Sequence, residues 1–376
     1  MDKQYNYGID LLRIISMVFV IILHVLGFGG ILGSVNPGTM QYNVSYFLKI
    51  AAFCAVDCFA LISGFVGYTK EEKSFSLVPL ITLWIRVIFL SSLTCIIVSV
   101  FGQGTISAKE LIKSFMPFSF GTYWYFNAYV GLLLIKPFVD KIIRNTSDKI
   151  LKESLIVIFF VFTLFALLAR TLSGYHPFDL AYGYSMTWVI ILYYVGGVIK
   201  KCDIQNLYST KQCLSTVLLC ITITFCWFLA TNDTIPALGL DFRLTFIDYT
   251  SPTIFLISVM YLFMFSRIHI SSKIARIIAV IAPGVFSAYI VNMQPLFVSV
   301  INTSRFAFLA NASPITLFFA VIMIAVLFVL CIALLDIGRV RLFKLVHIRE
   351  LSTWLNNQLK NFVRYWAKLL KLLCNG

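Results

Sequence analysis

The sequence has few charged residues. Asp, Glu, Lys and Arg make up 12% of its 376 residues, and 60% of the residues are hydrophobic. A soluble domain typically has roughly 25% charged residues. A soluble fold of this length cannot cover so much apolar side chain, even as two domains. The shortage of charge therefore excludes a soluble protein and predicts a chain that lies in a lipid bilayer.

Other signatures are also missing. The nine cysteines are scattered and show no paired spacing, so they predict neither a disulfide framework nor a metal site. No internal repeat resembles the inverted repeats of many transporters. The first apolar stretch lacks a signal-peptidase site and is interrupted by Arg13 and His24, which argues against a cleaved signal peptide. A net charge of +14 would suggest nucleic acid in a soluble protein, but here the basic residues gather in loops.

Long apolar runs are abundant. Crossing a bilayer takes about 20 predominantly apolar residues. On this criterion the sequence predicts an all-α, polytopic membrane protein of about ten transmembrane helices, near residues 10–32, 44–68, 75–101, 123–139, 150–172, 184–200, 213–231, 251–268, 274–301 and 313–337. We expect Pro283-Gly284 to kink or break the ninth of these helices, because proline cannot donate a helical hydrogen bond.

Lys and Arg are distributed unequally between alternate loops. With a cytoplasmic N-terminus, most of them fall in segments inside the cell, and the outside segments hold only Lys109, Lys113, Arg170, Arg243 and Arg305. Cytoplasmic loops carry the excess of basic residues in membrane proteins. The distribution predicts that both termini are cytoplasmic, which fits an even number of spans.

The C-terminal tail, residues 346–376, differs from the transmembrane domain of residues 1–345. Apolar side chains recur in it at spacings of three and four, and lysines and arginines line a different face. This pattern is typical of a basic amphipathic helix that lies on the anionic cytoplasmic leaflet. A helix that binds a partner protein is the alternative.

Three ionisable residues interrupt the first apolar run: Asp10, Arg13 and His24. An ionisable side chain at membrane depth is costly unless it is paired or hydrated, so each is a functional candidate. At 100° per residue, Arg13 and His24 differ by about 20° around the helix and are separated by about 16 Å along it. Asp10 lies within about 60° of both. The three residues therefore share one stripe, with Arg13 near the cytoplasm and His24 toward the outer side.

This stripe has two interpretations. An anionic group that enters from the cytosol would meet Arg13, and its reactive end would reach toward His24. Alternatively, Arg13 anchors the helix at the interface with Asp10 as its i, i+3 partner, and His24 hydrogen-bonds to a neighbouring helix. Spacing alone does not decide between the two interpretations.

Several segments resemble the membrane acyltransferase 3 family. Arg13 and His24, with ten residues between them, lie in "YGIDLLRIISMVFVIILH", and similar motifs follow in order: "VDCFALISGFVGY" (56–68), "FMPFSFGTYWYFNAYVGLLLIKPFVDKII" (115–143), "ILYYVGGVIKK" (191–201), "YTSPTIFLISVMYLFMFSRI" (249–268) and "LLDIGRVRLFK" (334–344). The order and spacing of these motifs carry the resemblance, over about residues 5–345. In "FSAYIVNMQPLF" (286–297), Asn292 stands where the family usually has His.

The resemblance implies acyl transfer from cytosolic acyl-CoA, usually acetyl-CoA, to a hydroxyl of a surface or lipid-linked glycan. It also implies a bacterial-type cytoplasmic membrane. His24 would be the general base or an acyl carrier, because imidazole titrates near neutral pH. Arg13 would hold the phosphates of the donor, with Asp10 and Arg86 beside it. No bound cofactor, metal or nucleic acid is expected.

The remaining site candidates come from three further helices. Asp57 either orients His24 or pairs with Arg86, and a buried structural ion pair is equally consistent with the sequence. Asn292 would support the site but cannot shuttle protons near pH 7. An aromatic cluster, Tyr123, Trp124 and Tyr125, would contact the acceptor sugar or belong to an interfacial aromatic belt. Lys49 is predicted to be interfacial.

Two other functions are compatible with the sequence. A transporter or flippase for a lipid-linked sugar would have a similar composition and helix number. A degenerate family member, acting as a sensor or an assembly subunit, is the third possibility because Asn292 replaces the usual His. The predicted partners of the enzyme are an acyl-CoA, a glycan or lipid-linked sugar, and membrane lipids.

Overall fold

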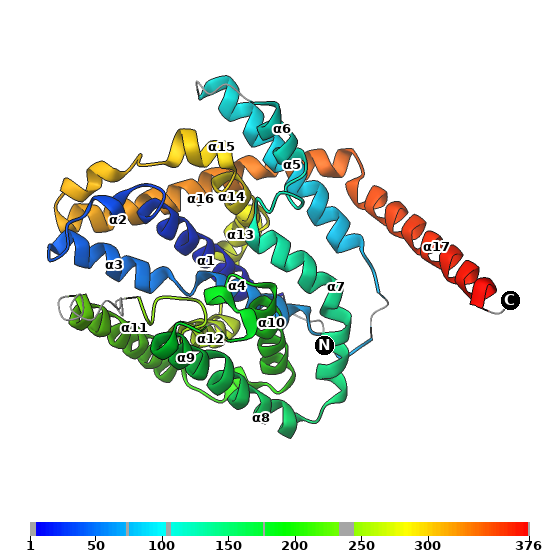
Figure 1. The fold of residues 1–376 in the computed structure, drawn as a ribbon, viewed down its shortest axis with the longest axis horizontal. Helices are drawn as coiled ribbons and strands as arrows, with labels where there is room; N and C mark the ends of the chain where they lie inside the picture. The colour runs from blue at the N-terminus through cyan, green and yellow to red at the C-terminus, as the bar shows by residue number, and fades with distance from the viewer. Residues whose placement is uncertain (1–4, 73–74, 103–106, 176, 233–243, 375–376) are drawn as a thin grey trace.

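The fold was analysed in a computed structural model, which describes residues 5–72, 75–102, 107–175, 177–232 and 244–374. Within these ranges the chain forms helices and loops and no β-strand. Figure 1 shows the helices gathered into one bundle from which the C-terminal helix extends. The all-helical fold class predicted from the sequence is confirmed for the described residues.

The helices follow one another with short connections. In chain order they are α1 (Tyr7–Leu26), α2 (Ile31–Ser34), α3 (Met40–Ala52), α4 (Ala55–Gly67), α5 (Val78–Phe101), α6 (Ala108–Phe115), α7 (Trp124–Asn145), α8 (Asp148–Ile158), α9 (Ala166–Ser173), α10 (Met186–Lys201), α11 (Thr210–Asn232), α12 (Pro252–Arg267), α13 (Ser272–Ile281), α14 (Val285–Asn292), α15 (Pro295–Phe297), α16 (Pro314–Leu345) and α17 (Ile348–Cys374). A π-helical segment, Phe159–Phe165, joins α8 to α9.

Each predicted apolar run is helical, but several runs are interrupted. The second run is broken between α3 and α4 at Phe53 and Cys54. The ninth breaks at Pro283-Gly284 as expected, where a 3₁₀ turn (Ala282–Gly284) separates α13 from α14. The fourth run, predicted over residues 123–139, extends further: α7 contains Pro137 and continues to Asn145.

Seven helical segments of the described chain are long and apolar enough to cross a membrane, or eight if one bent pair (Pro177–Gly183 with Met186–Lys201) is a single span. α12 is apolar but has only 16 residues. The chain is therefore a multi-pass membrane protein. The number ten and the cytoplasmic placement of both termini stay predictions, and "inner" and "outer" below refer to that predicted orientation.

The first helix occupies the centre of the bundle. α1 packs against α3, α4, α12, α14 and α16. It begins where the Asn6 side chain accepts a hydrogen bond from the Ile9 N–H, which satisfies one of the free donors at a helix start. Because α1 has neighbours on all sides, its polar stripe faces other helices rather than lipid.

Two glycines allow α4 and α10 to pack backbone to backbone. A Cβ on Gly64 would lie 1.9 Å from the Tyr193 carbonyl oxygen, and one on Gly196 would lie 2.1 Å from the Leu61 carbonyl oxygen. Small residues at such contacts let membrane helices approach closely. This contact fixes the rotation of α4, and hence the direction in which Asp57 points.

We expect Gly64→Ala to destabilise the protein by about 2 kcal/mol, because the added methyl group has no space and must push the two helices apart. Gly338→Ala is the matched control, since nothing lies within 4 Å of a Cβ at that position. Thermal unfolding in detergent measures both. Equal melting temperatures for the two variants would show that the α4–α10 contact is not as tight as described.

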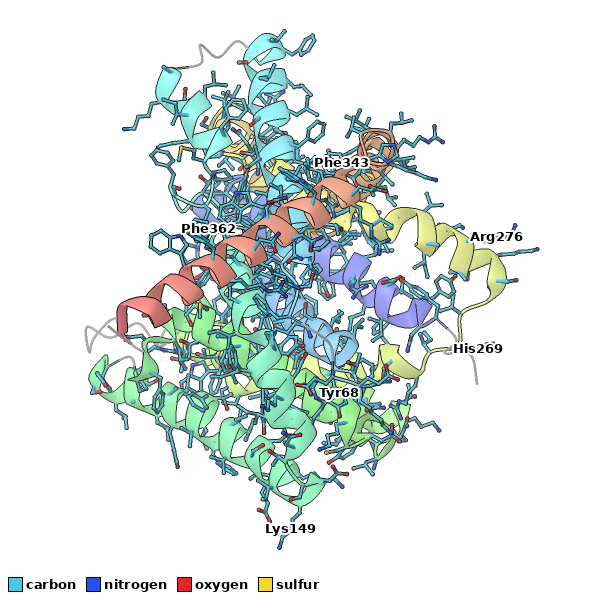
Figure 2. All side chains as sticks on the ribbon, turned by 90° about the vertical axis from the view of Figure 1, so that its right-hand side faces the viewer. Tyr68, Lys149, His269, Arg276, Phe343 and Phe362 are labelled. Carbon is cyan, nitrogen blue, oxygen red and sulfur yellow. The ribbon has the colours of Figure 1, made fainter. Side chains whose placement is uncertain are left out.

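Helix α17 lies on the inner side of the molecule. Figure 2 looks at this side, with α17 crossing the view and with Lys149 and Arg276, both in segments predicted to be cytoplasmic, at its edge. One face of α17 packs on α5: the Asn356 side chain accepts a hydrogen bond from the Leu77 N–H (2.9 Å), and Thr82 Oγ1 donates one to Ser352 Oγ (3.0 Å). Other side chains are exposed, including Leu351, Trp354, Leu359, Phe362 and Trp366. Contact with lipid through these residues stays a prediction.

Candidate active site

His24 lies in the last turn of α1 and is paired with Asn292 at the end of α14. The distance from His24 Nδ1 to Asn292 Oδ1 is 2.5 Å, and Asn292 is 3% exposed. An amide oxygen can only accept, so Nδ1 must carry the hydrogen. The other ring nitrogen, Nε2, therefore keeps its lone pair. This arrangement suits a histidine that takes a proton through Nε2.

A cavity of about 460 Å³ opens beside His24. Its walls come from α1, α3, α4, α7, α14 and the loops before α10 and α12. Most of the lining is apolar or aromatic, and Tyr184, Tyr249 and Tyr289 bring phenol groups that were not predicted from the sequence. These tyrosines belong to three distant segments, so only the fold could reveal that they meet. We refer to this space as the outer cavity.

Lys49 also lines the outer cavity, which the sequence interpretation missed. The sequence predicts an interfacial position for Lys49, because it lies within reach of a helix end. In the structure α3 begins at Met40, so Lys49 lies nine residues, or about 14 Å, below its outer end. Its Nζ lies 5.4 Å from the centre of the Tyr46 ring, and it forms no salt bridge with any described residue. The sequence does contain one sign of this buried position: Lys49 is an ionisable residue within an apolar run.

The three predicted acceptor-binding aromatic residues do not lie together. Trp124 and Tyr125 line the outer cavity, whereas Tyr123 is fully buried and its hydroxyl donates to Ser91 Oγ (3.1 Å). Tyr123 therefore does not line the outer cavity with the other two, because its side chain points toward α5. The Tyr125 N–H donates to the Tyr289 hydroxyl (3.3 Å), and the Tyr125 hydroxyl is buried without a hydrogen-bond partner in the described structure.

Asp57 neither orients His24 nor pairs with Arg86. Its Oδ1 accepts a hydrogen bond from the Trp188 Nε1–H (3.0 Å), and its side chain is fully buried. The close α4–α10 contact turns Asp57 toward α10, whereas Arg86 on α5 faces α14 and α16. Both predicted partners of Asp57 are thus corrected.

The inner end of α1 forms a second, smaller pocket of about 260 Å³. Arg13 Nη1 donates to Asp10 Oδ1 (2.5 Å), the predicted i, i+3 pair, and the Tyr5 hydroxyl donates to Asp10 Oδ2 (2.6 Å). The Asp10 side chain is 5% exposed and that of Arg13 is 33% exposed. Asp10 therefore holds the guanidinium in place while part of it remains accessible in the pocket. We refer to this space as the inner pocket.

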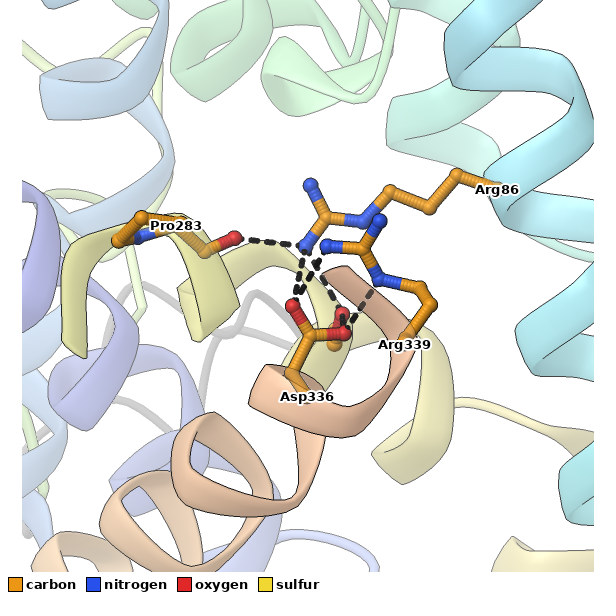
Figure 3. A network of polar contacts seen from close by, with 5 residues as sticks. Arg86, Pro283, Asp336 and Arg339 are labelled. Carbon is orange, nitrogen blue, oxygen red and sulfur yellow. Dashed lines mark hydrogen bonds and ion pairs between the residues drawn. The ribbon is translucent and has the colours of Figure 1, made fainter. Parts of the chain in front are cut away.

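Arg86 belongs to a cluster next to the inner pocket. Figure 3 shows Arg86 and Arg339 converging on Asp336, which Arg339 contacts through two hydrogen bonds of 2.6 Å. Arg86 Nη2 lies 3.5 Å from Asp336 Oδ2 and donates to the Pro283 carbonyl (2.8 Å). Pro283 also lines the inner pocket. Two guanidinium groups share one carboxylate, so the cluster carries an excess positive charge beside that pocket.

The two spaces lie along one face of α1. The outer cavity extends down the helix to Met17, and Arg13 follows four residues, or about 6 Å, further in. Residues four apart lie on the same helix face.

These features describe a membrane-embedded protein in which one helix connects a cationic inner pocket with a histidine-bearing outer cavity. Comparison with known families shows that the chain belongs to the acyltransferase 3 family, whose model, described as "Acyltransferase domain", matches residues 6–335. The resemblance stated from the sequence motifs is thereby confirmed. No curated protein and no solved structure matches the chain significantly.

Proposed function

We propose that the protein is a membrane O-acyltransferase that moves an acyl group, most simply acetyl, from a cytosolic acyl-CoA to a hydroxyl of a surface or lipid-linked glycan. The observation that carries this proposal is the His24–Asn292 pair on the wall of the outer cavity. It provides a base with a free Nε2 on the wall of a cavity where, on this proposal, the donor from inside and the acceptor from outside would meet.

The reaction needs one proton acceptor and one path for each substrate. Nε2 of His24 takes the proton of the acceptor hydroxyl, whose oxygen attacks the thioester carbonyl carbon. The C–S bond then breaks, the ester C–O bond remains, and the leaving thiolate of CoA receives the proton from His24. The Asn292 oxygen stabilises the positive charge that develops on the imidazole ring during this transfer.

The donor is assigned to the inner side by charge. CoA carries phosphate groups, and guanidinium groups bind phosphate through paired, charge-assisted hydrogen bonds. Arg13 is partly accessible in the inner pocket, and the excess charge of Arg86 and Arg339 lies beside it. The acyl arm would follow α1 past Met17 to His24. The acceptor sugar would stack on Trp124 and Tyr125 in the outer cavity.

The direct test is acyl transfer by the purified protein. Protein in detergent or proteoliposomes is incubated with radiolabelled acetyl-CoA and extracted lipid-linked glycans, and labelled ester is measured. Mass spectrometry of surface glycans from a deletion strain then identifies the acceptor by the loss of an acetyl-sized mass. A flippase would give a different pair of results. The purified protein would neither hydrolyse acetyl-CoA or longer acyl-CoAs nor transfer their acyl groups, and the deletion strain would accumulate lipid-linked sugar on the cytosolic face.

We expect Arg13→Gln to raise the KM for acetyl-CoA about 10- to 100-fold, because a hydrogen bond to a charged group is worth about 1.5–3 kcal/mol. The KM for the acceptor should not change. The variant also leaves Asp10 without its partner, so Asp10→Asn/Arg13→Gln serves as the charge-balanced comparison. Steady-state kinetics measures all three proteins. An unchanged KM for acetyl-CoA in both variants would remove Arg13 from the donor site.

A further inference from the structure

We propose that the acceptor carries an anionic group, a carboxylate or a phosphate, and that Lys49 binds it in the outer cavity. This inference rests on the proposed function and narrows its substrate class. It starts from the position of Lys49 rather than from the residues that perform the transfer.

Among the described residues, Lys49 has no counter-ion. It lies about 14 Å below the outer end of α3, and no carboxylate among the described residues forms a salt bridge with it. A charged side chain at this depth costs several kcal/mol unless it is paired or hydrated. Its only described polar contact is with the face of the Tyr46 ring, at 5.4 Å, which offsets part of that cost. An anionic ligand would supply the missing partner.

The charge of the outer cavity favours such a ligand. The described residues that line it include no Asp or Glu, and His24 and Lys49 are the only ionisable groups among them apart from tyrosine hydroxyls. The buried Asp57 lies in the neighbouring helix but is turned to Trp188 and does not line the cavity. A space with one cation and no anion attracts negative charge, and its low-dielectric walls strengthen that attraction.

The rest of the lining fits a sugar. The centres of the Trp124 and Tyr184 rings lie 4.8 Å apart on one wall. The Tyr125 hydroxyl is buried and has no hydrogen-bond partner among the described residues. Flat aromatic faces and an unpaired hydroxyl can hold the faces and the hydroxyl groups of a sugar ring. An anionic sugar would use both these groups and Lys49, whereas a neutral sugar would leave Lys49 unpaired.

Another role for Lys49 makes a different prediction. If Lys49 stabilised the oxyanion that develops on the thioester carbonyl, its charge would matter for every acceptor, including water. If it binds the acceptor, its charge matters only when the acceptor is charged. The two roles are therefore separated by changing the charge of the acceptor alone.

The experiment uses octyl β-glucuronide and its amide, octyl β-glucuronamide, which have the same ring hydroxyls but differ in charge; octyl glucoside 6-phosphate tests phosphate. Wild-type protein and the variants Lys49→Gln, Lys49→Arg and Lys109→Gln are compared, Lys109 being an exposed lysine of α6. Transfer from acetyl-CoA is measured, together with inhibition of acetyl-CoA hydrolysis by each glycoside. Thermal unfolding in detergent shows whether each variant is folded, so hydrolysis without glycoside reports only on the reaction with water.

Wild-type protein should prefer an anionic glycoside over the amide. Lys49→Gln should raise the KM or inhibition constant for that glycoside roughly 30-fold, the effect of losing a buried charge partner, and should leave the amide unchanged. Lys49→Arg should retain most of the preference, and Lys109→Gln should behave as wild type. Because the wild-type comparison needs no variant, a folding failure of Lys49→Gln leaves the inference testable.

Two results would overturn the inference. One is a wild-type protein that shows no preference for charge, in transfer or in inhibition. The other is a Lys49→Gln variant whose reaction rate falls by the same factor with both glycosides and with water, which would mean that Lys49 stabilises the oxyanion. A wild-type protein that neither hydrolyses acetyl-CoA nor transfers its acetyl group would contradict the proposed function instead, so the two failures are distinguishable.

Discussion

His24→Ala is expected to lower acyl transfer by about 10²- to 10⁴-fold, the usual contribution of a general base. The substitution removes Nε2 from the outer cavity, so the acceptor hydroxyl must lose its proton to water. Donor binding at Arg13 lies at the other end of α1, and the KM for acetyl-CoA should therefore change little. Initial rates with radiolabelled acetyl-CoA measure the effect.

The control is His269→Ala, because His269 is exposed in the loop between α12 and α13, outside both the outer cavity and the inner pocket. This variant should have wild-type activity and the same yield in the membrane. Rapid-quench measurement of the first turnover in neutral denaturant adds a second readout: an acetyl label on the wild-type protein that hydroxylamine releases, and that is absent from His24→Ala, would identify His24 as an acyl carrier rather than a base. Normal glycan acetylation by a His24→Ala variant that is correctly inserted in the membrane would contradict both roles of His24.

Local features of the site could be read from the sequence. Asp10 and Arg13 are three residues apart on one helix, so their pairing follows from helix geometry, and the structure shows it. The break at Pro283-Gly284 follows from the missing N–H of proline and is likewise present. The family could be recognised because its motifs keep their order along the chain.

Contacts that depend on how the helices are rotated against one another could not be predicted from the sequence. Arg86 was expected near Asp57, but Asp336, 250 residues along the chain, takes that place. The rotation of α4 is set by backbone contacts at Gly64 and Gly196, which composition does not reveal. Lys49 was misjudged for a related reason, since its depth depends on where α3 begins and on the break at Phe53.

Asn292 is the residue for which the structure changes the interpretation most. From the sequence it was a departure from the family, which usually has His at this position, and it left the possibility of a degenerate protein. The structure places its side-chain oxygen 2.5 Å from His24 Nδ1, a contact between residues 268 positions apart. In this position an amide can orient the histidine, a role that needs an acceptor and no proton transfer.

Asn292→Leu is therefore expected to reduce kcat about 100-fold or more, with little change in either KM. Leucine has a similar size but accepts no hydrogen bond, so the hydrogen of His24 can move to Nε2 and leave no lone pair for the acceptor hydroxyl. Loss of the orienting partner of a catalytic histidine has large effects on kcat in other enzymes, up to roughly 10⁴-fold.

Asn292→Asp separates orientation from simple packing, because aspartate keeps an accepting oxygen at the same distance from the backbone. We expect it to retain most of the activity that Asn292→Leu loses. Asn356→Leu is the matched control: Asn356 is similarly buried (4% exposed) and also accepts a hydrogen bond, but on α17, outside the outer cavity and the inner pocket. Steady-state kinetics and detergent melting are compared across the three variants. If Asn292→Leu and Asn356→Leu lower kcat by the same factor, the loss follows from packing, and the His24–Asn292 contact does not set the tautomer of His24.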